Sequence, residues 1–276
     1  MKTVLALTAG VALGLAAGAF PRGSPSSSSP QTPPAVDSGD YNGDGTDELA
    51  VFNQQARWAV RNVTRLSFGD GNDKPVSGDY DDDGTSDIAV YRHSQGMWSV
   101  RNVTRFYFGS TSDLAVPGDY TGSGRCRAGI FRPSTGMWSV RDLTRCYFGN
   151  STYDPVRGYV LGKKVFAVFH PENGLWAIRD LTRFYFGAAG DQPVAGEYGG
   201  DPWPEIVIFR RSTGLWAIRD ATRIYFGGSL DEAVPADYDG DGIDEPGLFR
   251  YTTDMWSVRD LTRVYYGTYG DEPVTR

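Results

Sequence analysis

Short runs of alternating apolar and polar residues recur along most of the chain, and no stretch of ten or more residues has helical periodicity. One copy of the pattern begins with an acidic segment, and residues 88–92, rich in β-branched and aromatic side chains, then predict a strand. A turn ending at Gly96 leads into a second strand at 97–101, and a third follows at 104–108. With one more strand near the preceding Gly-Asp-Tyr, each copy predicts four short strands.

The pattern repeats six times. Tryptophans mark the register at spacings of 40, 40, 38, 40 and 40 residues: Trp58, Trp98, Trp138, Trp176, Trp216 and Trp256. Four strands in a period near 40 residues are typical of a propeller blade. We therefore predict an all-β, six-bladed β-propeller over 38–276, with blades at about 38–76, 77–116, 117–156, 157–194, 195–234 and 235–276. The segment around Ser38–Tyr41 is expected to close the ring near Pro273 and Val274.

The first 37 residues differ from the rest of the chain. Residues 1–19 combine an early lysine, an apolar run and small residues at its end, which predicts a secretory signal peptide, with a membrane anchor as the alternative. Residues 20–37 are rich in proline and serine and predict a linker. We therefore expect a secreted, extracellular protein without a membrane span after cleavage. Whether Cys126 and Cys146 pair is left open by the sequence.

Acidic loops open three of the six units. Carboxylates or amides stand at positions 1, 3, 5 and 9, with glycine at position 6 for a sharp bend. Hard oxygen ligands at this spacing suit Ca²⁺, and the backbone carbonyl of position 7 would complete the set. The predicted ligands are Asp40, Asn42, Asp44, Thr46 and Glu48; Asp79, Asp81, Asp83, Thr85 and Asp87; and Asp237, Asp239, Asp241, Ile243 and Glu245.

The same loops exclude an EF-hand, because its position 12 requires glutamate and here holds Val51, Val90 or Leu248. The third and fourth units have lost the acidic pattern, and the fifth keeps only Glu197, Asp201 and Glu205. We therefore expect about three Ca²⁺ sites, in blades 1, 2 and 6. Solvated acidic turns without metal are the alternative.

Each unit also carries the motif Trp-x-[Val/Ile]-Arg-[Asn/Asp]-x-Thr-Arg, for example from Trp98 to Arg105. Guanidinium groups stack well on aromatic rings, so the favoured interpretation is that these arginines hold adjacent blades together. The alternative is a set of six equivalent ligand pockets, each with an arginine and an aromatic wall. The formal net charge of −7 argues against nucleic-acid binding.

Three Asn-x-Thr sequences, at Asn62, Asn102 and Asn150, are candidate glycosylation sites. Four of the six motif tips have aspartate where Asn62 and Asn102 stand, so a left-handed turn explains the residue type equally well.

Departures from the sixfold pattern mark a candidate recognition surface. Trp203 is the one tryptophan outside the register, and Lys163 and Lys164 lie in the corresponding loop of the fourth unit. These loops lack the metal pattern, so we expect them to be available for a ligand. The alternative is that Trp203 caps its own loop.

The combination Gly-Asp-Tyr-Asp-x-Asp-Gly-x-x-Asp-Ile-Ala-Val-Tyr-Arg, a tryptophan hairpin and a closing Phe-Gly resembles the FG-GAP/VCBS repeat of integrin-α-like propellers. Integrin-type heads have seven blades, however, and this chain has six units. The resemblance implies adhesion, lectin-like sugar binding, or a non-catalytic module of secreted proteins.

No catalytic motif is found, and neither histidine has a nucleophile or metal spacing around it. We therefore expect a calcium-stabilised, non-catalytic extracellular recognition module for carbohydrate or protein. The alternatives are a structural subunit of an extracellular filament or surface assembly, in which the chain would self-assemble, and a polysaccharide-active enzyme.

Overall fold

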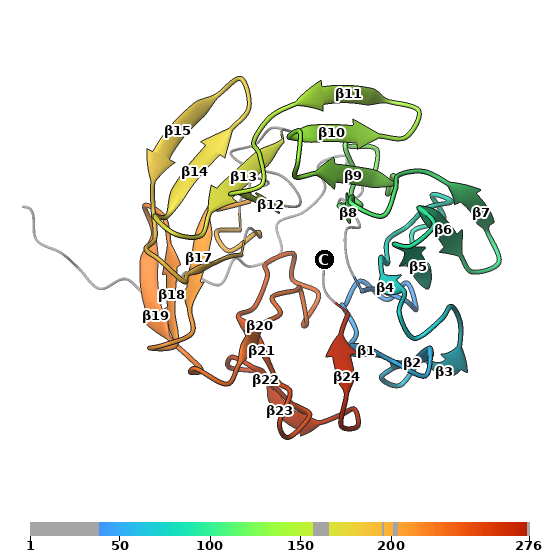
Figure 1. The fold of residues 1–276 in the computed structure, drawn as a ribbon. Helices are drawn as coiled ribbons and strands as arrows, with labels where there is room; N and C mark the ends of the chain where they lie inside the picture. The colour runs from blue at the N-terminus through green and yellow to red at the C-terminus, as the bar shows by residue number, and fades with distance from the viewer. Residues whose placement is uncertain (1–38, 157–165, 195, 201–203, 275–276) are drawn as a thin grey trace, which may run out of the picture. The chain divides into compact units, whose positions relative to one another are not determined.

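The computed structural model describes residues 39–156, 166–194, 196–200 and 204–274, all within one compact unit, Pro33–Arg276. Six four-stranded antiparallel sheets surround a common centre as the blades of a propeller (Figure 1). The described residues contain no helix, and hence none able to cross a membrane. The all-β, six-bladed prediction is confirmed. The predicted signal peptide and linker lie outside the described residues.

Each sheet runs from a short inner strand to an outer strand at the rim (Figure 1). The first sheet contains β24 (Asp271–Pro273), β1 (Ala50–Asn53), β2 (Arg57–Val60) and β3 (Thr64–Ser67). The second contains β4 (Lys74–Pro75), β5 (Ala89–Arg92), β6 (Met97–Val100) and β7 (Thr104–Tyr107). The third contains β8 (Leu114–Ala115), β9 (Gly129–Arg132), β10 (Met137–Val140) and β11 (Thr144–Tyr147).

The remaining sheets repeat this order. The fourth contains β12 (Asp154–Val156), β13 (Ala167–His170), β14 (Leu175–Ile178) and β15 (Thr182–Tyr185). The fifth contains β16 (Gln192–Pro193), β17 (Val207–Arg210), β18 (Leu215–Ile218) and β19 (Thr222–Tyr225). The sixth contains β20 (Glu232–Ala233), β21 (Gly247–Arg250), β22 (Met255–Val258) and β23 (Thr262–Tyr265). In the second to sixth sheets the inner strand ends one or two residues before the repeat boundary drawn from the sequence, so each of these sheets begins in the preceding unit.

The ring is closed by a pairing between the two ends of the propeller. β24 pairs antiparallel with β1, with Val51 opposite Pro273 and Asn53 opposite Asp271. The closing strand is thus 50–53, whereas the sequence pointed to 38–41. Tyr41 packs in the same apolar cluster as Val274, so the expected contact between the ends is present as a packing contact beside the strand pair.

The six register tryptophans form the centres of the sheets. All six are at most 1 % exposed, and each packs on a ring of the preceding strand, as Trp98 does on Tyr91 with centroids 4.9 Å apart. Each indole N–H also donates to the carbonyl of the closing Phe-Gly or Tyr-Gly ten residues later, at 2.9–3.2 Å. Because a buried N–H without a partner is costly, this bond fixes the spacing between the tryptophan and the Phe-Gly.

Left-handed residues stand at the predicted turns. Gly96 has φ 62°, and a Cβ there would lie 2.4 Å from the carbonyl oxygen of Gly109. The six motif tips have φ between 57° and 63°, and this confirms the turn role of Asn62, Asn102, Asp142, Asp180, Asp220 and Asp260.

Cys126 and Cys146 are both buried and are not joined in a disulfide. Cys146 stands on β11 at the position that Phe106 has on β7 and belongs to an apolar cluster with Trp138. Burial raises the pKa of its thiol. The two side chains therefore serve as core residues.

Four ion pairs between a buried aspartate and a partly exposed arginine, which no predicted motif includes, tie inner loops to the second strand of their sheets. In each, an aspartate precedes an arginine by 19 residues, and the guanidinium binds the carboxylate through Nε and Nη2 at 2.6–3.0 Å. The pairs are Asp73–Arg92, Asp113–Arg132, Asp191–Arg210 and Asp231–Arg250. The constant spacing is the sequence signal that would have revealed them.

The other two sheets vary the pair: the first keeps the aspartate and replaces only the arginine, and the fourth replaces both members. In the first sheet the Asn53 amide donates to Asp271 at 2.9 Å. In the fourth, Tyr153 and His170 stand at the two positions, and their rings meet edge to face with centroids 5.0 Å apart. The two positions thus form one contact, which is either ionic, amide–carboxylate or aromatic.

This exchange predicts a coupled pair of substitutions in the fifth sheet. Arg210→His alone should destabilise the protein by about 2 to 4 kcal/mol, because Asp191 loses its cation while buried. Adding Asp191→Tyr should recover at least about 1 kcal/mol, a coupling measurable in a double-mutant cycle by denaturant unfolding. Effects that add to within about 0.5 kcal/mol would contradict the interpretation of the positions as one contact.

Candidate metal sites

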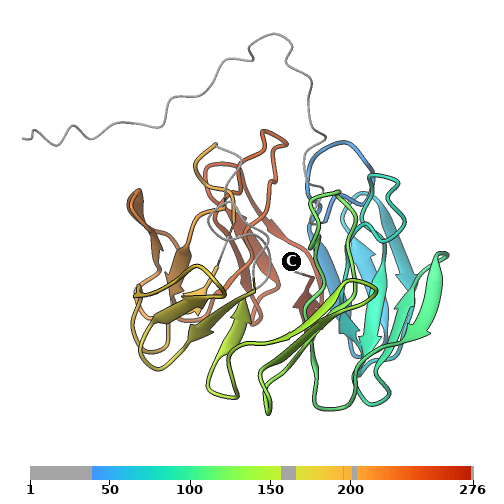
Figure 2. The same cartoon turned by 90° about the horizontal axis from the view of Figure 1, so that it is seen from above.

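The three acidic loops immediately precede β1, β5 and β21. Figure 2 shows the blue loop of the first unit and the red-brown loop of the last rising on the same side of the ring. They belong to sheets 6, 1 and 2, which are neighbours because the ring closes between the last and the first unit.

The first aspartate of each loop organises the turn around itself. Asp40 accepts backbone hydrogen bonds from Gly43 at 2.6 Å and Gly45 at 3.0 Å, and Asp79 accepts from Asp82 at 2.6 Å and Gly84 at 2.9 Å. Asp237 accepts the equivalent bonds from Gly240 and Gly242. The left-handed glycine at position 6, with φ between 86° and 90° in the three loops, turns its N–H toward this carboxylate.

Each loop brings three carboxylates together. Ligand atoms within 4.8 Å of one another come from Asp40, Asp44 and Glu48; from Asp79, Asp81 and Asp87; and from Asp237, Asp239 and Glu245. Asp83 and Asp241, at position 5, lie outside these groups. Their carboxylates accept the backbone N–H of position 7 at 2.8 and 2.9 Å, a bond that Asp44 also accepts, at 2.9 Å, while it belongs to the first group. The amide of Asn42 in the first loop donates to Glu48.

The electrostatics of the loops favours a bound cation. Burial, with repulsion from the neighbouring aspartates, raises the pKa of Glu48 to about 7, that of Asp87 to about 6 and that of Glu245 to about 8. Without a cation, these acids would be partly protonated near neutral pH. A small cluster of carboxylate oxygens, partly withdrawn from water, fits a hard divalent cation such as Ca²⁺.

The third loop keeps the turn without the acidic cluster. Asp119 accepts from Gly122 at 2.7 Å and Gly124 at 2.8 Å, as the first aspartates of the other loops do. Thr121, Ser123 and Arg125 then stand at positions 3, 5 and 7, and Arg125 donates to the carbonyl of Tyr80 at 2.9 Å. The loop geometry therefore comes from the first aspartate and the glycines, and the additional carboxylates are a separate feature.

The loops are also joined to one another. The N–H of Asp47 donates to the carbonyl of Asp237 at 2.8 Å, and Ser86 and Cys126 make the same bond to Asp40 and Asp79. The first aspartate of each acidic loop would thus bind a cation with its side chain, while its backbone carbonyl accepts a hydrogen bond from the next blade.

The remaining sequence-predicted site residues are separate from these loops. Trp203, Lys163 and Lys164 lie outside the described residues. Asn62 and Asn102 are exposed at the hairpin tips, and Asn150 is exposed in the turn after Gly149, where its side chain accepts from the backbone of Thr152.

The raised pKa values predict how the metal-free protein responds to pH. The folded state holds protons on Glu48, Asp87 and Glu245 at pH values where the unfolded state has released them. Its free energy of unfolding should therefore fall as pH rises from about 5 to about 8. Denaturant unfolding of chelator-treated protein measures this slope. Calcium should oppose it, because the cation replaces the protons.

Glu245→Gln is the matched control, since a neutral amide of the same shape removes one titration and should flatten the slope. A stability of the metal-free protein that rises over this range, or a slope that Glu245→Gln leaves unchanged, would contradict the assignment.

Comparison with known proteins supports this architecture. The model of the FG-GAP repeat family matches residues 32–71, which include the first acidic loop and the first Trp to Phe-Gly hairpin. No curated protein matches the chain.

Among solved structures, the chain is similar to the crystal structure of BBS1N in complex with ARL6DN, soaked with mercury. The identity is 11 %, the TM-score 0.50, and the match covers 86 % of this chain and 81 % of that one. The lead-soaked crystal of the same complex matches at 8 % identity and a TM-score of 0.48, covering 88 % of this chain and 84 % of that one. The similarity concerns the fold alone. The family match at the first repeat and the six four-stranded blades together support an FG-GAP β-propeller family for this chain.

Proposed function

We propose that the chain is a secreted, calcium-stabilised recognition module that binds extracellular carbohydrate or protein and does not catalyse a reaction. The observation that carries the proposal is the set of three carboxylate clusters in neighbouring blades of an FG-GAP propeller. An FG-GAP propeller fits a recognition module in general, because its rigid ring presents loops and blade edges to a partner.

Calcium would have a structural role in this proposal. Asp40, Asp44 and Glu48 would hold one ion, Asp79, Asp81 and Asp87 a second, and Asp237, Asp239 and Glu245 a third. A divalent cation supplies charge neutralisation and rigid coordination in each loop. Extracellular calcium would keep such sites filled, which agrees with the signal peptide predicted for residues 1–19.

The proposal predicts that the purified protein binds a defined extracellular ligand and that chelation weakens the binding. Arrays of glycans and of extracellular matrix proteins, probed with labelled protein in calcium and again in chelator, provide the measurement. We expect saturable binding to at least one class of ligand. Binding should be weaker in chelator, because less of the protein is folded there. Absence of saturable binding to both classes would contradict a recognition function.

A further inference from the structure

The two arginines of the repeated motif have different surroundings. The first packs on the preceding blade: Arg141 lies 3.8 Å from the ring centroid of Phe106, and Arg219 lies 3.8 Å from that of Phe184. In the last four units it also lies within 3.3–3.6 Å of the aspartate that follows it. The two ring contacts join adjacent blades, as the favoured interpretation of the motif expects, whereas the aspartate contacts lie within one unit.

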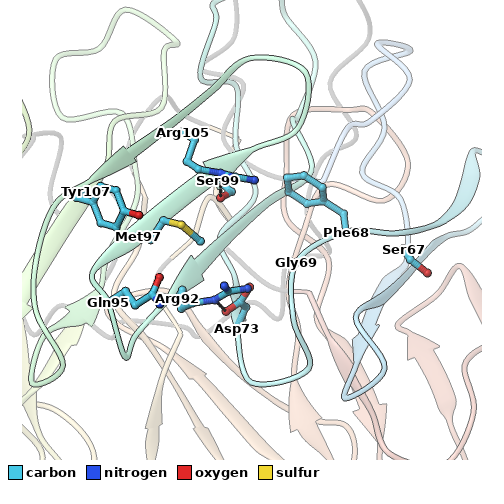
Figure 3. Close-up of a pocket in the computed structure, with 10 residues that line it drawn as sticks. All are labelled: Ser67, Phe68, Gly69, Asp73, Arg92, Gln95, Met97, Ser99, Arg105 and Tyr107. Atoms are coloured by element: carbon cyan, nitrogen blue, oxygen red, sulfur yellow. Dashed lines mark hydrogen bonds and ion pairs between the residues drawn. The ribbon is translucent and has the colours of Figure 1, made fainter.

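The second arginine lies instead beside an opening between blades. In the second unit, Arg105 on β7 lines a pocket of about 500 Å³, whose opposite side is formed by Phe68 and Gly69 of the first unit (Figure 3). Its Nε donates to the Ser99 hydroxyl at 3.3 Å. No carboxylate of the described residues forms an ion pair with Arg105, so none of them neutralises its charge.

The pocket wall combines a positive charge with an aromatic surface. Arg92 and Asp73 lie together at one edge, and their charges cancel in the ion pair (Figure 3). Tyr107 is 72 % exposed beside Arg105, although a tyrosine ring of this size usually buries more of its surface. Arg105 therefore leaves a net positive charge, next to an exposed ring and the buried floor residue Met97.

An amide group completes the wall. Gln95 is exposed at the pocket and can donate or accept hydrogen bonds, whereas the Ser67 hydroxyl points away from Arg105 and Tyr107 (Figure 3). A volume near 500 Å³ lies within the range of small-molecule sites. A ligand that satisfies all of these groups has one anionic group, at least one hydroxyl and a flat apolar face.

The site is repeated at the neighbouring boundary. A second pocket of about 390 Å³ lies between the sixth and first sheets, with Arg65 at the position of Arg105 and Tyr266 at that of Phe68. The guanidinium of Arg65 lies 5.8 Å from the Tyr266 ring. Ser67 takes the place of Tyr107 here, so this copy has no exposed ring at that position.

We propose that the pocket between the first and second blades binds a carboxylate-bearing sugar, such as a uronic acid residue of a polysaccharide. The carboxylate would take a two-pronged contact from Arg105, since a planar guanidinium matches it. The apolar face of the ring would lie on Tyr107, and Gln95 would bind a hydroxyl. This assignment rests on the proposed recognition function and names its ligand class.

The test uses the methionine at the pocket floor as a local probe. Full-length protein labelled with ¹³C at the methionine methyl groups is titrated with methyl β-D-glucuronide and with methyl β-D-glucoside, which differ only in the carboxylate. We expect a saturable shift of the Met97 methyl resonance, with the glucuronide bound about tenfold more tightly, the contribution of a charged hydrogen bond.

Variants separate the roles of the wall residues. Arg105→Ala should abolish the preference for the glucuronide, Arg105→Lys should keep part of it, and Tyr107→Ala should weaken both sugars. Tyr269→Ala is the matched control, because Tyr269 is 93 % exposed and lines neither pocket, and it should bind as the unmodified protein does.

Absence of a saturable Met97 shift, equal affinity for the two sugars, or an unchanged preference in Arg105→Ala would each overturn the assignment. An acidic peptide that shifts Met97 where the glucuronide does not would also overturn it. If the arrays show ligand binding while Met97 does not respond, the site assignment alone fails. If the arrays show none, the recognition function fails.

Discussion

Closure of the ring is the constraint on which the rest of this propeller depends. Each blade is covered by its neighbours only if the last blade meets the first, and this junction consists of β24, three residues long, paired with β1. The three acidic clusters lie in sheets 6, 1 and 2, on both sides of that junction. The loops are also joined to one another by backbone hydrogen bonds. Cations bound in the loops would therefore stabilise the ring next to the short junction between β24 and β1.

Much of the fold could be predicted from the sequence because it repeats. The spacing of the six tryptophans indicated the number of blades. Within each blade, the distance from the tryptophan to the Phe-Gly is fixed because the indole N–H must reach a carbonyl ten residues later. The metal loops were predictable for the same reason, since position 1 and position 6 together build the turn. The structure adds that position 5 supports the turn in all three loops, because Asp44, Asp83 and Asp241 each accept the backbone N–H of position 7.

Other features could not be predicted from local patterns. The inner strands are only two or three residues long and carry no periodicity, so the sheet boundaries and the closing strand were misplaced. The Asp–Arg pairs join residues 19 apart across a turn, and their importance becomes visible only when the buried carboxylates are located. The two motif arginines look alike in sequence, yet Arg141 packs on a ring of the preceding blade while Arg105 borders a pocket, a difference that becomes visible only in the structure.

Carboxylates at particular loop positions are proposed to hold calcium. Isothermal titration calorimetry, which counts the calcium ions bound, can compare two variants with substitutions at adjacent positions. Asp81 belongs to the second cluster, whereas its neighbour Asp82 carries the same charge in the same loop outside the cluster. We expect the unmodified protein and the Asp82→Asn variant to bind about three calcium ions each, and the Asp81→Asn variant to bind about two. Equal losses in the two variants, or no calcium binding by the unmodified protein, would contradict the proposal.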